Sequence, residues 1–158
     1  MDIIHMQKVV RYFEYLRDTK ELDYSNFKFG AVSYELQQNL NELFESGLVD
    51  ETDDKYVLTT EGKEIAEKML KDFDVKERQK LLFAKQQLND LSTDELMYFM
   101  YKLIPSTQKN STEFARLEKK KSVLVRSLFL KGRINATTAA KWLETSEKEF
   151  LDCLPSHN

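Results

Sequence analysis

The sequence predicts a mainly α-helical protein, with a small β-hairpin in its N-terminal half and a wholly helical C-terminal extension. Three observations lead to this fold class. Apolar residues recur at intervals of three and four over most of the chain, which is the helical period. The 158 residues include only 4 Gly and 2 Pro, too few for the many turns of a sandwich or barrel. Two short runs at 48–58 flank a polar turn, as in a hairpin.

The first helix is expected at 3–17, where apolar side chains at helical spacing form one face. The triplet 27–29 alternates and is expected to form a short strand, after which Gly30 releases the chain into a second helix. That helix begins near Ser33 and ends at Gly47, a residue suited to the left-handed conformation that closes many helices.

The hairpin strands are expected at 48–50 and 55–58, and Thr60 is expected to cap a third helix that closes at 72–74. This order of three helices with a small hairpin wing is the plan of a winged helix-turn-helix. In that fold the second helix of the motif enters the major groove of DNA and the wing contacts the backbone.

The C-terminal half is expected to consist of helices. The first lies at 75–88, and Ser92 with Glu95 forms a capping box for the next, which Pro105 ends. Residues 106–111 have the composition of a linker.

A long helix is then expected at 113–131. Two short helices follow, capped at Asn135 and Ser146, in a helix-turn-helix arrangement. We therefore divide the chain into a winged-helix domain at 1–74, connecting or dimerisation helices at 75–105, and a long basic helix with a helix-turn-helix-like tail at 112–158.

One predicted helix is apolar on nearly all sides, so it lies either at the centre of the core or against a partner. If it faces a second copy, the interface residues are Leu96, Met97, Phe99, Met100 and Ile104.

The net charge of −3 hides an asymmetry between the two halves. Residues 1–74 contain 9 Lys and Arg against 17 Asp and Glu, a net charge of −8, whereas residues 75–158 carry +5. Such a chain can pair its halves internally, self-associate, or present two partner surfaces. Separate solvated helix faces are the remaining alternative.

The sequence lacks the signatures of an enzyme. His5 and His157 lie at opposite ends, and no glycine-rich phosphate loop precedes a helix. We expect no catalytic residues, no cofactor, no metal and no small-molecule substrate. A single cysteine, the absence of a secretory signal and the absence of a membrane-spanning run indicate a cytoplasmic protein.

Two sets of residues are candidates for binding. A recognition helix would read DNA bases through Tyr34, Gln37, Gln38 and Asn41. Acidic residues surround this helix and the wing and would repel phosphate, so these side chains are alternatively solvent-facing. The basic candidates for contact with nucleic acid or an acidic partner, alternatively a solvated helix face, are Lys119, Lys120, Lys121, Arg126, Lys131 and Arg133.

Four stretches carry a resemblance to a known family: Phe27-Lys28-Phe29-Gly30, Tyr34-Glu35-Leu36, Gly47-Leu48-Val49 and 56–62. With Met6-Gln7-Lys8-Val9-Val10, they resemble the small winged-helix proteins related to the Panacea (SocA-like) antitoxin domain and their YwgA-like relatives. The segment 132–151 looks like the helix-turn-helix of a group of small prokaryotic antitoxins. These resemblances imply a regulatory or neutralising role, without catalysis, in a prokaryote or its virus.

The sequence therefore favours a non-catalytic, antitoxin-like or transcription-regulator-like protein that binds a protein partner or itself as a homodimer. Contact with DNA through the basic helix is an option that the sequence leaves open. One alternative is a dimeric, sequence-specific DNA-binding repressor, which predicts steep salt dependence. The other is a structural homodimer that is indifferent to DNA, which predicts a large apolar interface.

Overall fold

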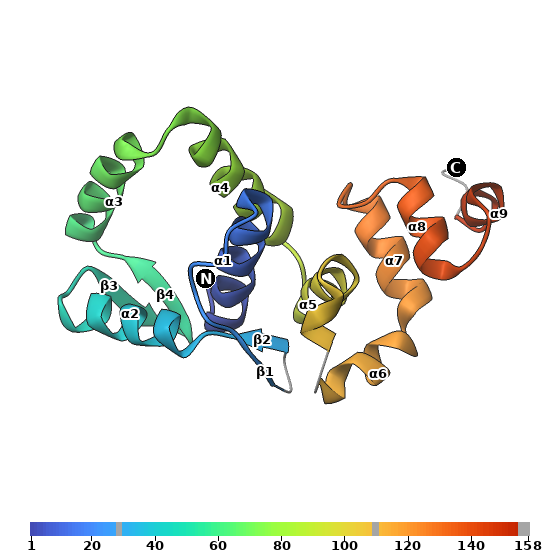
Figure 1. The fold of residues 1–158 in the computed structure, drawn as a ribbon, viewed down its shortest axis with the longest axis horizontal. Coiled ribbons are helices and arrows are strands. Elements are labelled where there is room, and N and C mark those ends of the chain that lie inside the picture. The colour runs from blue at the N-terminus through green and yellow to red at the C-terminus, as the bar shows by residue number, and fades with distance from the viewer. Residues whose placement is uncertain (28–29, 109–110, 155–158) are drawn as a thin grey trace.

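The computed structural model describes residues 1–27, 30–108 and 111–154, and the chain is mainly helical with two small antiparallel hairpins (Figure 1). The helices are α1 (Ile3–Arg17), α2 (Tyr34–Glu45), α3 (Thr60–Asp72), α4 (Val75–Leu88), α5 (Thr93–Leu103), η1 (Pro105–Gln108, a 3-10 turn), α6 (Thr112–Glu118), α7 (Lys121–Leu130), α8 (Ala136–Leu143) and α9 (Glu147–Asp152). The strands are β1 (Ser25–Phe27), β2 (Gly30–Val32), β3 (Val49–Thr52) and β4 (Lys55–Leu58). The expected helical class and the hairpin between α2 and α3 are confirmed.

Capping side chains set most helix starts where the sequence indicates them. Ser92 and Glu95 form a reciprocal capping box at the start of α5, and a second box opens α9. Ser33 caps α2 by accepting a hydrogen bond from the Leu36 amide. The third helix begins one residue earlier than expected, because Thr59 rather than Thr60 accepts the first amide bond.

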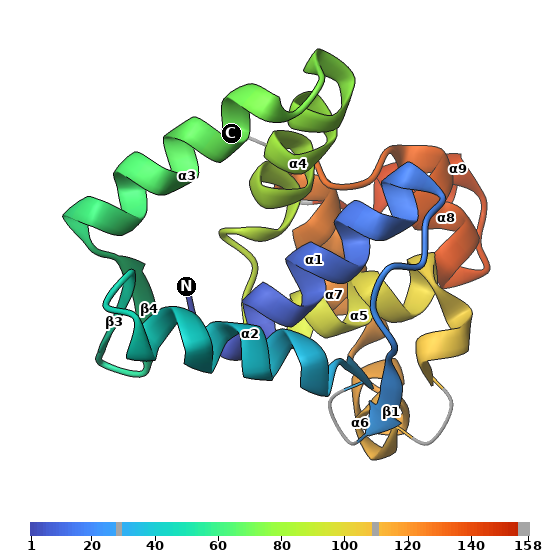
Figure 2. The same cartoon turned by 60° about the vertical axis from the view of Figure 1, so that its left-hand side comes forward.

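Helix α5 lies at the centre of the core, between α1 on one side and α7 on the other (Figures 1 and 2). One continuous apolar cluster includes side chains of α1, α4, α5, α7, α8 and α9. Trp142 of α8 packs edge-on against both Tyr98 and Phe99 of α5. Helices of all three expected segments share this core, since α1 packs against α4 and α5, and α5 packs against α6 and α7.

This packing corrects the expected oligomer interface. Leu96, Met97, Phe99, Met100 and Ile104 are all buried within the single chain, with 0–6% of each residue exposed. Of the two alternatives for an all-round apolar helix, α5 is the central one. In the single chain these side chains therefore belong to the core and do not form an exposed apolar surface.

The single long helix expected at 113–131 is wrong, because the chain leaves the helical conformation at Lys120 (φ −103°, ψ 7°) and divides it into α6 and α7. The break lets both pieces follow α5. Phe114 of α6 packs edge-on against Tyr101, and Leu128 of α7 is fully buried in the same cluster.

The linker expected at 106–111 is in part a regular turn of 3-10 helix. In the expected linker, residues 106–108 belong to η1, Thr107 is buried, and the Asn26 amide donates to the Ser106 carbonyl at 3.1 Å. Residues 109–110 lie outside the described residues, as do residues 28–29 of the expected strand. Gly30 begins β2 rather than the helix; its φ is +78°, and an added Cβ would meet the Tyr101 ring at 3.0 Å.

Residues 34–72, comprising α2, β3, β4 and α3, form an arm that stands away from the core helices (Figure 2). Its buried apolar side chains are Leu40 and Val49, and neither belongs to the main core cluster. Asp53 and Asp54 both have positive φ, which gives the two-residue hairpin turn the twist that antiparallel strands require. The arm is thus held by local contacts rather than by deep burial.

Gly62 is the point at which α3 joins the rest of the arm. An added Cβ there would lie 2.0 Å from the Leu48 carbonyl oxygen, which accepts the Thr59 amide at 3.1 Å. We expect Gly62→Ala to displace α3 and destabilise the arm by about 2 kcal/mol or more, as overpacked sites do. Gly47→Ala is the matched control: its φ of +72° strains the backbone, but nothing lies within 4 Å.

Amide hydrogen exchange measures this effect. Exchange over 60–72 should accelerate in Gly62→Ala far more than in Gly47→Ala, while α5 stays protected. Equal acceleration in the two variants would contradict the steric explanation.

Candidate functional site

Three of the six basic candidate residues have carboxylate partners within the chain. Lys120 pairs with Asp94 at 3.0 Å and Lys131 with Glu95 at 2.8 Å. Arg133 pairs with Asp90 at 2.7 Å. A charged cluster therefore joins α7 and the residues on either side of it to the start of α5. It consists of these three basic residues and their three carboxylate partners, Asp90, Asp94 and Glu95.

Glu95 is the buried centre of this charged cluster. Its carboxylate accepts bonds from Lys131, from the Ser127 hydroxyl and from both the amide and hydroxyl of Ser92. Burial by itself would raise the pKa of Glu95, but these bonds outweigh it and hold the pKa at about 2. Asp94 also has a pKa of about 2, chiefly because Arg116 donates two bonds to it.

The other three basic candidates remain available. Among the described residues, Lys119, Lys121 and Arg126 have no ion-pair partner. Arg126 borders a shallow surface hollow along α7, beside Val123 and Leu130. Figure 1 places α6 and α7 on the opposite side of α5 from α2, so one chain does not present this group beside the expected recognition helix.

The expected recognition helix is open to solvent along most of its length. Tyr34, Gln38 and Asn41 are exposed, whereas Gln37 is half-buried and donates to the Asn41 side chain at 3.3 Å. In the whole α2–α3 arm there are 11 Asp and Glu against 4 Lys, a net charge of −7. An approaching phosphate backbone would therefore meet repulsion along the arm.

The same arm exposes apolar side chains. Six large apolar residues of the arm each have between 41% and 63% of their surface accessible to solvent: Tyr34, Leu43, Phe44, Val57, Leu58 and Met69. Scattered apolar residues are normal on a surface, but a concentration of them on one poorly buried unit is typical of an interaction site.

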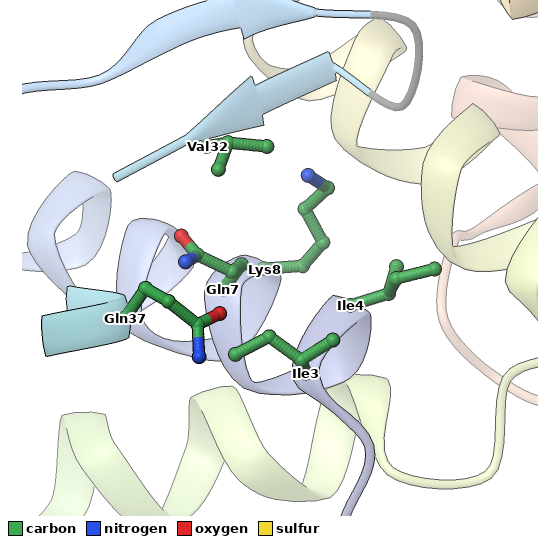
Figure 3. Close-up of a pocket in the computed structure, with 6 residues that line it drawn as sticks. All are labelled: Ile3, Ile4, Gln7, Lys8, Val32 and Gln37. Carbon is green, nitrogen blue, oxygen red and sulfur yellow. The ribbon is translucent and has the colours of Figure 1, made fainter. Parts of the chain in front are cut away.

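A second site, which sequence reasoning missed, lies where α1 meets the loop before α2 (Figure 3). Gln7 is buried, and its amide makes two 2.9 Å bonds with the Ser33 backbone, one donated and one accepted. The next residue, Lys8, is also buried and donates to the Ala31 carbonyl at 2.7 Å. The two polar residues lie off the apolar face expected for this helix, so the periodicity gave no sign of their burial.

Lys8 borders a cavity of about 190 Å³, together with Ile3, Ile4, Gln7, Val32 and Gln37. No carboxylate pairs with Lys8 among the described residues. Burial lowers its pKa from the ordinary 10.5 to about 8, because removing an ammonium from water disfavours the charged form.

The only histidine among the described residues, His5, is held in place by two neighbouring groups. Its Nδ1 lies 2.7 Å from the Asp2 carboxylate and its Nε2 lies 2.8 Å from the Leu91 carbonyl. Within the described ranges, no group of three or more His, Cys, Asp or Glu side chains is arranged to hold a metal ion. No helix in the described part of the chain is long and apolar enough to cross a membrane. His157 lies outside the described residues.

Comparison with protein-family models, with curated proteins and with solved structures found no match. The assignment of a site therefore depends on the geometry of this chain alone.

The low pKa of Glu95 makes stability depend on pH. Because the folded pKa of about 2 is below the ordinary 4.5, this carboxylate stabilises the fold above about pH 4.5, and the contribution disappears as the pH falls toward 2. We expect Glu95→Gln to lower the free energy of unfolding at neutral pH by about 1–3 kcal/mol, since it removes the charge partner of Lys131. The variant should also lose less stability on acidification, measured by urea unfolding across the acidic range.

Glu45→Gln is the control for this experiment. Glu45 lies at the end of α2 and is exposed, and its carboxylate makes no ion pair or hydrogen bond among the described residues. An acid profile of Glu95→Gln no flatter than that of Glu45→Gln would contradict the central role of the buried carboxylate.

Lys8 also makes stability rise with pH, but at higher pH and for a different reason, because here burial disfavours the charged form. Its folded pKa lies below its unfolded pKa, so the folded protein binds fewer protons and becomes more stable as the pH rises from about 8 to about 9.5. Lys8→Met keeps a similar volume without a charge and should not show this rise in urea unfolding. Tyrosines whose pKa burial raises, such as Tyr12 and Tyr98, act mainly above this window. A rise that persists in Lys8→Met would show that another group causes it.

Proposed function

We propose that this chain is a non-catalytic regulatory protein that binds a protein partner through the α2–α3 arm. One observation carries the proposal: the arm combines exposed apolar side chains with a net charge of −7. Apolar area supplies the favourable free energy of association, and the acidic border favours a partner with a basic surface.

The arrangement of α2, the β3–β4 hairpin and α3 supports a winged-helix plan for this arm. In such a fold α2 would be the recognition helix and the hairpin the wing. The resemblance to proteins related to the Panacea domain adds an antitoxin-like or transcription-regulator-like role. A protein surface suits the acidic α2 better than DNA, because affinity for DNA requires Lys and Arg at the phosphates.

The partner is either another protein or a second copy of this chain. The arm suits both, since the apolar side chains of α5 are enclosed in the core, whereas six of the fifteen large apolar side chains exposed among the described residues lie on the arm. Contact with DNA would rest on Lys119, Lys121 and Arg126, which lack ion-pair partners among the described residues.

Photo-crosslinking in the cells that produce the protein tests this proposal. Phe44 on α2 and Met69 on α3 are each replaced by p-benzoylphenylalanine, with Leu130 on α7 as a control of similar exposure. We expect discrete crosslinked products from positions 44 and 69, whose mass distinguishes a second copy from another protein. Equal products from position 130, or none from the arm, would overturn the proposal.

A DNA titration separates the alternatives. We expect no binding by fluorescence anisotropy at about 200 mM salt and only weak, sequence-independent binding at about 50 mM. Tight binding that falls steeply with salt, and that is lost when Lys119, Lys121 and Arg126 are changed together to Glu, would instead establish a DNA-binding regulator.

A further inference from the structure

The cavity beside Lys8 combines a buried cation with apolar walls. Only 3% of Lys8 is exposed, yet its one hydrogen-bond partner among the described residues is the Ala31 carbonyl. An ammonium group has three donors, so two of them have no protein acceptor in the described part of the chain. Buried charges are normally paired, and a lone carbonyl compensates only part of the lost hydration.

The neighbouring polar groups do not supply the missing charge. Both ends of the Gln7 amide are bonded to Ser33, and the Gln37 amide nitrogen donates to Asn41. Figure 3 shows the Lys8 side chain extending between Val32 and Ile4, with Ile3 and Gln37 completing the wall. Ile3, Ile4, Val32 and Gln37 are only half-buried, so the cavity opens to the surface.

We propose that this cavity binds a small organic monocarboxylate, whose carboxylate pairs with the Lys8 ammonium and whose apolar body lies against Ile3, Ile4 and Val32. The volume of about 190 Å³ is below the roughly 300–1,000 Å³ typical of sites for drug-sized ligands, which limits the ligand to a few carbon atoms beyond the carboxylate. A phosphate fits this site less well, because phosphate sites offer several backbone amides or an arginine fork. Here the Ser33 amide is already bonded to Gln7.

The test is a titration followed by the methyl resonances of Ile3, Ile4 and Val32, using isobutyrate and benzoate as probes. Isobutanol and benzyl alcohol are matched neutral probes with the same apolar bodies. We expect saturable shifts with dissociation constants in the millimolar range for the carboxylates. The neutral probes should bind about tenfold or more weakly, since they lack the charge-assisted bond.

Two variants assign the binding to this cavity. Lys8→Met should abolish the preference for carboxylates over alcohols, and Val32→Phe should block both classes by filling the cavity while leaving Lys8 in place. Lys141 on α8 is an exposed lysine outside the cavity, and Lys141→Met should leave the titration unchanged. An absence of saturable shifts, or an unchanged carboxylate preference in Lys8→Met, would overturn the proposal. So would binding that survives Val32→Phe.

Discussion

The complete enclosure of α5 is the constraint on which the rest of the structure depends. Its seven residues from Glu95 to Tyr101 are all buried, so the helix must be covered on every side. No single neighbour can do this, because a helix covers only one face of another. Helix α1 from the N-terminal half and helices α6, α7 and α8 from the C-terminal half therefore pack around it, and a single core results.

Charge complementarity follows the same geometry. The one acidic residue within this buried stretch, Glu95, lies where Lys131 and two hydroxyl groups can reach it. Asp90 and Asp94 beside it bring in Arg133 and Lys120. These three of the fifteen Lys and Arg residues of 75–158 are thus paired within the chain, and the pair of Lys131 with the buried Glu95 carboxylate is screened less by salt than exposed pairs are.

The arm and the Lys8 cavity are the parts of the molecule that this packing does not explain. The arm places apolar and acidic side chains in solvent although its residues make regular helices and a regular hairpin. At its base, Gln7 and Lys8 of α1 hold the backbone of β2 and the cap of α2. The two proposals are independent, since one concerns the exposed surface of the arm and the other a cavity at its base.

The sequence by itself determined most of the helices, most of their caps and the β3–β4 hairpin, because hydrophobic period, capping boxes and turn residues act within a few positions of the chain. The segments at 3–17, 75–88 and 93–103 show this directly. Only the tertiary structure decided which surfaces are free. Leu96 and Phe99 read equally well as core or interface, and only the helices packed around them place them inside. The sequence predicted Lys120 and Lys131 as unpaired basic residues, whereas the fold places them beside Asp94 and Glu95. The burial of Lys8 has no local signal, because the β2 carbonyl that accepts its bond is 23 residues away in the chain.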